Sequence, residues 1–207
     1  MDVSGGHHDA GDYSKYTTNS AQLIHALVFA ADSLPGVAQL DNLGIPESGD
    51  GKSDVLQIAM WEANFLAKMQ DTDGGFYFLV YPKKRKYETD VLPDRGDPQV
   101  VFPKTTSVTA AATAALAQAA SSPAFKKQFP EAAADYLARA KAGWAFLQGA
   151  LGKHGRKGAY QKITHYGLGF QDADELAWAA TEIFLATGDP AAHQDLLQNF
   201  NPSDKKT

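Results

Sequence analysis

The sequence contains no cysteine, which excludes disulfide bridges, thiolate metal sites and a cysteine nucleophile. An excess of positive charge is also lacking, because 19 lysine and arginine residues stand against 24 aspartate and glutamate residues, for a formal net charge of -5. A mildly acidic chain is poorly suited to wrapping nucleic acid or adhering to an anionic membrane. We therefore expect neither nucleic acid nor a membrane among its partners.

Long apolar runs are absent as well, since each is interrupted well before the roughly 20 residues that a membrane helix requires. The first residues show neither a basic leader nor an apolar core, so we expect no signal peptide in this chain. With 207 residues, 44% of them hydrophobic, the chain has the length of one globular domain. We predict a single domain over residues 1–207.

The sequence also lacks any segment with convincing strand alternation, and it shows helical periodicity instead. Apolar residues recur at intervals of three and four over segments near 18–33, 53–70, 106–120, 130–147, 174–187 and 190–200, which predicts about six helices. Glu62 is the one charged member of the apolar stripe in the second segment. The three tryptophans Trp61, Trp144 and Trp178 fall on helical stripes, so we expect them in the core.

Two long segments, 71–104 and 149–173, have no period and are rich in aromatic residues or glycine. Structureless loops longer than about 15 residues are uncommon in compact domains unless they have a function. Helix pairs that alternate with such loops favour an all-α fold of the α/α toroid type. In such a fold inner and outer helices alternate, and the loops form a cleft at one end.

The densest chemistry lies in residues 2–16, where Asp9 and Asp12 are separated only by Ala10 and Gly11. Small intervening residues allow a tight turn, so both carboxylates can face one water molecule. One carboxylate of such a pair can act as a base while the other orients the water. The spacing alone is also typical of an ordinary loop before a helix, with Asp12 as a solvated capping residue.

Residues 4–16, Ser-Gly-Gly-x-x-Asp-Ala-Gly-Asp-Tyr-x-Lys-Tyr, resemble the signature near the start of glycoside hydrolase family 9, the inverting cellulases. Further segments resemble later landmarks of that family in the same order along the chain. They are 45–51 with 54–56, then 61–70, 73–77, 103–110, and 174–180 with 186–189.

The resemblance implies an (α/α)6 barrel that hydrolyses β-1,4-glucosidic bonds in cellulose or related β-glucans with inversion at the anomeric carbon. It assigns Asp12 as the general base and Asp9 as the residue that helps to hold the attacking water. The family usually has an aromatic residue, most often tryptophan, where this sequence has His7. The residues expected along the bound sugar are His7, His8, Tyr13 and Tyr166.

The general acid of the family is a glutamate near the far end of the catalytic domain, and an inverting site holds it about 6.5–9.5 Å from the base. The chain resembles the first half of the barrel, so we expect the acid to be missing from it. No glutamate matches the acid motif among Glu47, Glu62, Glu88 and Glu175. Three interpretations stay open: an endoglucanase-type hydrolase, a catalytically incomplete glucan-binding remnant, and a half-barrel completed by homo-oligomerisation through its exposed edge.

Three carboxylates in four residues, Asp172, Asp174 and Glu175, suit a hard cation that prefers oxygen ligands. The same residues can instead stabilise the start of a helix through its dipole. Many family members bind calcium at the position of Asp174 and Glu175, so the resemblance implies a structural calcium site and no required cofactor. Family members are generally secreted, which predicts secretion by parentage.

Overall fold

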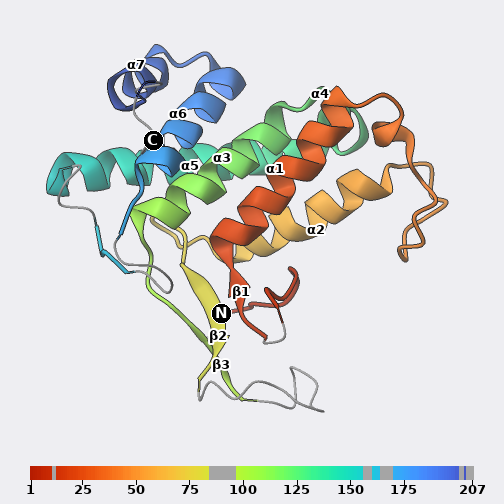
Figure 1. Cartoon of the computed structure of the whole chain (residues 1–207), viewed down its shortest axis with the longest axis horizontal. Coiled ribbons are helices and arrows are strands. Elements are labelled where there is room, and N and C mark those ends of the chain that lie inside the picture. The colour runs from red at the N-terminus through yellow and green to blue at the C-terminus, as the bar shows by residue number, and fades with distance from the viewer. Residues whose placement is uncertain (11–12, 84–96, 156–159, 164–169, 201–202, 204–207) are drawn as a thin grey trace.

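The computed structural model describes residues 1–10, 13–83, 97–155, 160–163, 170–200 and 203 (Figure 1). Its helices are α1 (Thr17–Ser33), α2 (Asp54–Lys68), α3 (Thr106–Ser121), α4 (Pro123–Gln128), α5 (Pro130–His154), α6 (Ala173–Thr187) and α7 (Pro190–Asn199), with a 3-10 turn η1 (Val37–Gln39) after α1. The six predicted helices are confirmed with small shifts at their ends. Helix α5 continues to His154, into a segment expected to be a loop, and the short α4 was not predicted.

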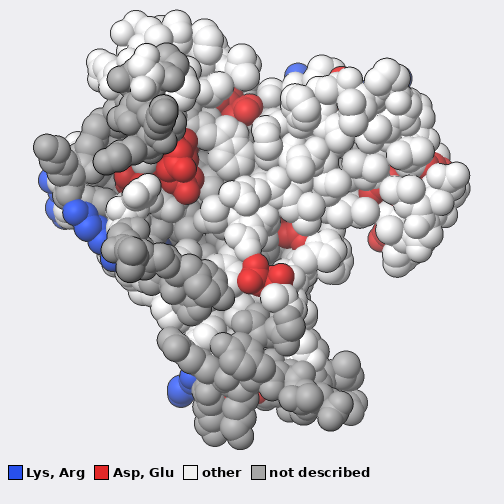
Figure 2. Space-filling view, in the orientation of Figure 1, with Lys and Arg blue, Asp and Glu red and all other residues white. Residues whose placement is uncertain are grey.

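Six of the helices form three pairs, and the pairs are arranged in two layers. Helix α1 packs against α2, α3 against α5, and α6 against α7, while α3 also contacts both α1 and α6. Helices α1, α3 and α6 therefore form one row, with their partners outside it (Figure 1). Beneath α2, the connection from α1 and the amino-terminal segment lie on either side of a notch in the molecular surface (Figure 2). None of the described helices is long and apolar enough to cross a membrane.

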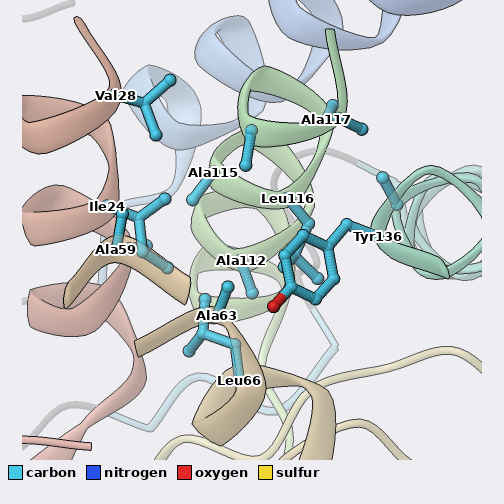
Figure 3. Close-up of a cluster of buried hydrophobic side chains, with 14 of the residues drawn as sticks. Ile24, Val28, Ala59, Ala63, Leu66, Ala112, Ala115, Leu116, Ala117 and Tyr136 are labelled. Carbon is cyan, nitrogen blue, oxygen red and sulfur yellow. The ribbon is translucent and has the colours of Figure 1, made fainter. Parts of the chain in front are cut away.

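The core lies where α1, α2, α3 and α5 meet (Figure 3). Most residues of α3 are buried, and the majority of them are alanines, whose small side chains let helix axes approach closely. Larger side chains such as Ile24, Leu66 and Leu116 fill the remaining space. The hydroxyl of Tyr136 reaches through this core to donate a hydrogen bond to Asn64 Oδ1 at 2.7 Å, which satisfies a buried polar atom.

No segment of the sequence shows convincing strand alternation, yet the mostly helical structure includes a short sheet. Strands β1 (Lys15–Tyr16), β2 (Leu79–Pro82) and β3 (Gln99–Val101) form an antiparallel sheet in the order β1-β2-β3. Lys15 pairs with Val80, and Val80 pairs with Val101. All residues of β2 are buried, so its sequence shows no alternation between apolar and polar positions. The predicted aperiodic segment 71–104 thus holds two of the three strands.

The sheet fixes the start of α1. Thr17 donates its backbone N–H to Phe78 O at 3.2 Å and its hydroxyl to Tyr77 O at 2.6 Å. Because β1 runs directly into α1, these bonds hold the residues that precede the helix at one end of the molecule. That end carries the Asp9 segment.

Lys104 joins the turn after α2 to the start of α3. Its ammonium group lies 2.7 Å from a carboxylate oxygen of both Asp71 and Asp73. Hydrogen bonds from Lys104, from the Thr72 N–H and from the Tyr77 hydroxyl lower the pKa of Asp71 to about 2. The ion pair therefore stabilises the folded chain as long as Asp71 is ionised.

We predict that Lys104→Met lowers the free energy of unfolding by about 1 kcal/mol at neutral pH, because the pair is partly exposed. The contribution is complete above the ordinary pKa of 3.8 and is lost as the pH falls towards about 2. Urea unfolding across this range checks it, with Lys141→Met on the exposed side of α5 as control. Parallel pH profiles for wild type and Lys104→Met would contradict the assignment.

Candidate active site

The amino-terminal segment forms a hollow with the start of α1. A cavity of about 170 Å³ is lined by His7, His8, Asp9 and Asn19, among others. The ring of Tyr13 lies beside that of His8, with a centroid separation of 4.8 Å. The structure thus brings Asp9 together with three of the predicted sugar contacts. The predicted base Asp12 and the predicted contact Tyr166 lie outside the described residues.

Asp9 is held through both its backbone and its side chain. Its backbone N–H donates to Ser14 O at 2.8 Å, so residues 9 and 14 lie together across a turn. The side-chain amide of Asn19, in the first turn of α1, donates to Asp9 Oδ1. The carboxylate therefore has one oxygen fixed by a helix, as a water-positioning group requires. Sequence reasoning gave no signal for Asn19.

Glu62 anchors the same segment from α2. Its side chain is fully buried, and Oε1 accepts the backbone N–H of His7 at 2.7 Å and also contacts His7 Nδ1. Oε2 has no hydrogen-bond partner among the described residues. Burying a carboxylate costs several kcal/mol unless it is paired. The contacts with His7 offset the cost of burying Glu62. In the sequence, a single charged residue within an apolar stripe was the signal that Glu62 has a partner.

The segment before His7 is pressed onto α2. Gly6 has φ of 70°, and a Cβ there would lie 2.7 Å from Phe65 Cγ, so only glycine fits. Buried Lys15 donates to the carbonyl oxygens of Val3 and Gly5, the latter at 2.8 Å. Burial lowers the pKa of Lys15, and its ammonium group lies 4.6 Å from the centre of the Phe65 ring. Helix α2 thereby determines the path of residues 3–7.

The predicted metal ligands lie at the start of α6. Asp172 accepts a hydrogen bond from the Thr106 hydroxyl, while Asp174 and Glu175 occupy the first helical turn. Burial, with the nearby Asp174 carboxylate, raises the pKa of Glu175 to about 8, and Glu175 Oε2 has no hydrogen-bond partner in the described part of the chain. The raised pKa and the unpaired oxygen of Glu175 are both expected for a carboxylate group that has no cation beside it. Among the described residues, however, no three acidic or histidine side chains converge as a complete metal site.

One of the three tryptophans departs from its expected place. Trp144 and Trp178 are partly buried against the core, as predicted. Trp61 is 54% exposed, so its prediction as a core residue was wrong. Trp61 lies two positions from both Ala59 and Ala63, which face the core, and two residues turn a helix by about 200°. Its ring consequently projects from the opposite side of α2.

We predict that Glu62→Ala raises the rate of hydrogen exchange at the His7 amide by about tenfold or more, because that N–H loses its acceptor. Glu62→Gln keeps an acceptor oxygen of similar size and should retain most of the protection. Exchange followed by NMR under native conditions measures the effect, with Glu131→Ala on the surface of α5 as control. Unchanged exchange in Glu62→Ala would contradict the anchoring role.

Comparisons with known proteins agree with this architecture. Residues 1–207 match the family model described as glycosyl hydrolase family 9. Endoglucanase C of Cellulomonas fimi is 32% identical over 92% of this chain, and the cellulose 1,4-beta-cellobiosidase of Acetivibrio thermocellus is 30% identical over 90%. The chain spans only 18% and 22% of these two relatives, respectively.

A solved structure gives the same result. The crystal structure of a metagenome-derived glycoside hydrolase family 9 endoglucanase superposes with a TM-score of 0.76 at 32% sequence identity. The superposition covers 96% of this chain and 36% of that one, so the three helix pairs correspond to part of its barrel. On the match over its whole length, the chain belongs to glycosyl hydrolase family 9.

Proposed function

We propose that the chain provides the base side of an inverting β-1,4-glucan hydrolase. The observation that carries the proposal is the fixed Asp9 carboxylate in a hollow lined by His7 and His8. The names of the relatives, an endoglucanase and a cellobiosidase, support cellulose or a related β-glucan as substrate. Xyloglucan, mixed-linkage glucan and glucosamine oligomers are the alternatives within the family, and one relative in Bacteroides ovatus is named as xyloglucan-specific. Parentage predicts secretion.

In the proposed reaction Asp12 removes a proton from a water molecule that Asp9 helps to hold. The water oxygen attacks the anomeric carbon as the glycosidic bond breaks, and a carboxylic acid protonates the departing oxygen. Inversion follows because the water attacks from the face opposite the leaving group. His8 and Tyr13, whose rings lie side by side, would contact the sugar at this point.

We assign the general acid to no glutamate of this chain. Glu62 is buried and bound to His7, and Glu175 lies in the acidic start of α6. Glu47 is exposed in the connection before α2, and Glu88 lies outside the described residues. The proposal therefore concerns the water-activating half of the reaction.

We predict that Asp12→Asn lowers turnover of soluble β-1,4-glucan by about 100-fold or more, because a general base contributes roughly that factor. Asp9→Asn should lower it less, since the base remains. A reducing-sugar assay with the purified chain measures both, with Asp135→Asn as control for an exposed carboxylate on α5. Unchanged turnover in Asp12→Asn would contradict its role as base.

The assay also separates the alternative interpretations. Activity that rises more steeply than protein concentration would indicate a site completed by association of two chains. A chain that binds cello-oligosaccharides without cleaving them would be a glucan-binding remnant. Sedimentation at several protein concentrations supplies the matching measurement of mass.

We also propose that Asp174 and Glu175, with Asp172 nearby, bind a structural calcium ion. We predict that millimolar Ca²⁺ raises the melting temperature of the wild-type chain by about 5 °C, because an ion that binds only the folded state stabilises it. The double variant Asp174→Asn with Glu175→Gln should show no such rise. Glu131→Gln is the matched control, and an unchanged melting temperature in the wild type would contradict the proposal.

A further inference from the structure

A second, larger hollow adjoins the active-site segment. Its volume is about 400 Å³, and its walls come from α2, from residues 45–47 and from His7. It lies in the notch beneath α2, between the connection from α1 and the amino-terminal segment (Figures 1 and 2). The proposed reaction uses none of the α2 residues that line it.

Trp61 provides this hollow with a flat apolar surface. The side chain belongs to the outer face of α2 and is largely open to solvent. Ile45 and Pro46 contribute further apolar surface to the same hollow. A large aromatic ring that buries little area in the fold costs free energy in water and gains contact when a flat apolar face covers it. The C–H face of a pyranose ring is such a surface.

Two amide side chains in this hollow, Gln57 and Asn64, are each held in place by one hydrogen bond to a neighbouring side chain. Gln57 is only 8% exposed, and its Nε2 donates to Asp50 Oδ2 at 2.9 Å. Its Oε1 has no hydrogen-bond partner within the described residues, but this oxygen is buried from solvent and is therefore closed to a ligand. The hydroxyl of Tyr136 fixes Asn64 by donating to its Oδ1, which turns the Nδ2 donor of Asn64 away from that bond. The exposed side chain of Asn64 thus offers a hydrogen-bond donor to a ligand hydroxyl group, which can accept it.

His7 connects this hollow to the active site. It lines both the 400 Å³ hollow and the 170 Å³ hollow that contains Asp9. Its Nδ1 contacts Glu62, so Nε2 remains as the ring atom for a further polar contact. An extended ligand that passes His7 can therefore occupy both hollows at once.

We propose that the Trp61 hollow binds glucosyl residues of the same β-glucan chain that is cleaved at Asp9. Trp61 stacks on a sugar ring, and the Asn64 amide donates a hydrogen bond to one of its hydroxyl groups. An apolar peptide segment would cover Trp61 but leave the Asn64 amide unpaired, which favours a carbohydrate. The inference rests on the proposed function for its substrate class and adds a residue that sets the preferred chain length.

Isothermal titration with cellobiose and cellohexaose tests this. The wild-type chain should bind cellohexaose more tightly than cellobiose. In Trp61→Ala the ratio of the two affinities should fall by about tenfold. Trp61→Tyr retains a flat ring and should restore most of it. Phe29→Ala is the matched control, because Phe29 is an aromatic residue on α1 that is 57% exposed and lines neither hollow. Maltohexaose controls for the linkage.

The outcomes are distinguishable. An equal gain with chain length in wild type and Trp61→Ala overturns the Trp61 site and leaves the proposed function standing. A wild-type chain that binds no cello-oligosaccharide overturns the proposed substrate class and the site with it. Loss of the gain in Phe29→Ala as well would show a general effect of removing exposed aromatic residues, which also overturns the site.

Discussion

Close packing along α3 is the constraint on which the other elements depend. Alanine side chains let α1, α5 and α6 approach one central helix, so the three helix pairs share a single core. Because α1 and α6 are both held against α3, the Asp9 segment and the acidic start of α6 are fixed parts of one framework. A larger side chain anywhere on the buried faces of α3 would push apart elements that lie far from each other in sequence.

The proposed active-site end of the molecule depends on a second interaction, in which the buried Glu62 carboxylate accepts a hydrogen bond from the His7 backbone. Glu62 and Phe65 on α2 determine where the amino-terminal segment runs, and Trp61, one turn before Phe65, lies beside Gly5 of that segment and remains exposed. One helix therefore positions the proposed active site and carries the proposed platform for the sugar chain. Loops that carry function are commonly placed by rigid elements in this manner.

The elements with a clear apolar stripe could be predicted from the sequence, and the resemblance singled out Asp9, which the structure places in the proposed active-site segment. The sheet could not, because β2 is buried throughout and β1 has only two residues. The exposure of Trp61 depends on which face of α2 meets α1, which periodicity alone left ambiguous for a single aromatic residue. Asn19 and Asn64 are ordinary polar residues in sequence, and only their neighbours in the fold give them a role.

The anchoring of the amino-terminal segment has a consequence for the order of folding. The residues that hold His7 and Lys15 in place lie far downstream, since Glu62 follows His7 by 55 residues and β1 pairs with β2 around Val80. During synthesis this segment emerges before α2 and β2, so it has nothing to dock on until they have formed. Contacts of such long sequence separation form late because closing the intervening loop is entropically costly. This segment is thus made before the elements that hold it but becomes ordered after them, and the proposed active site forms only when the surrounding helices are in place.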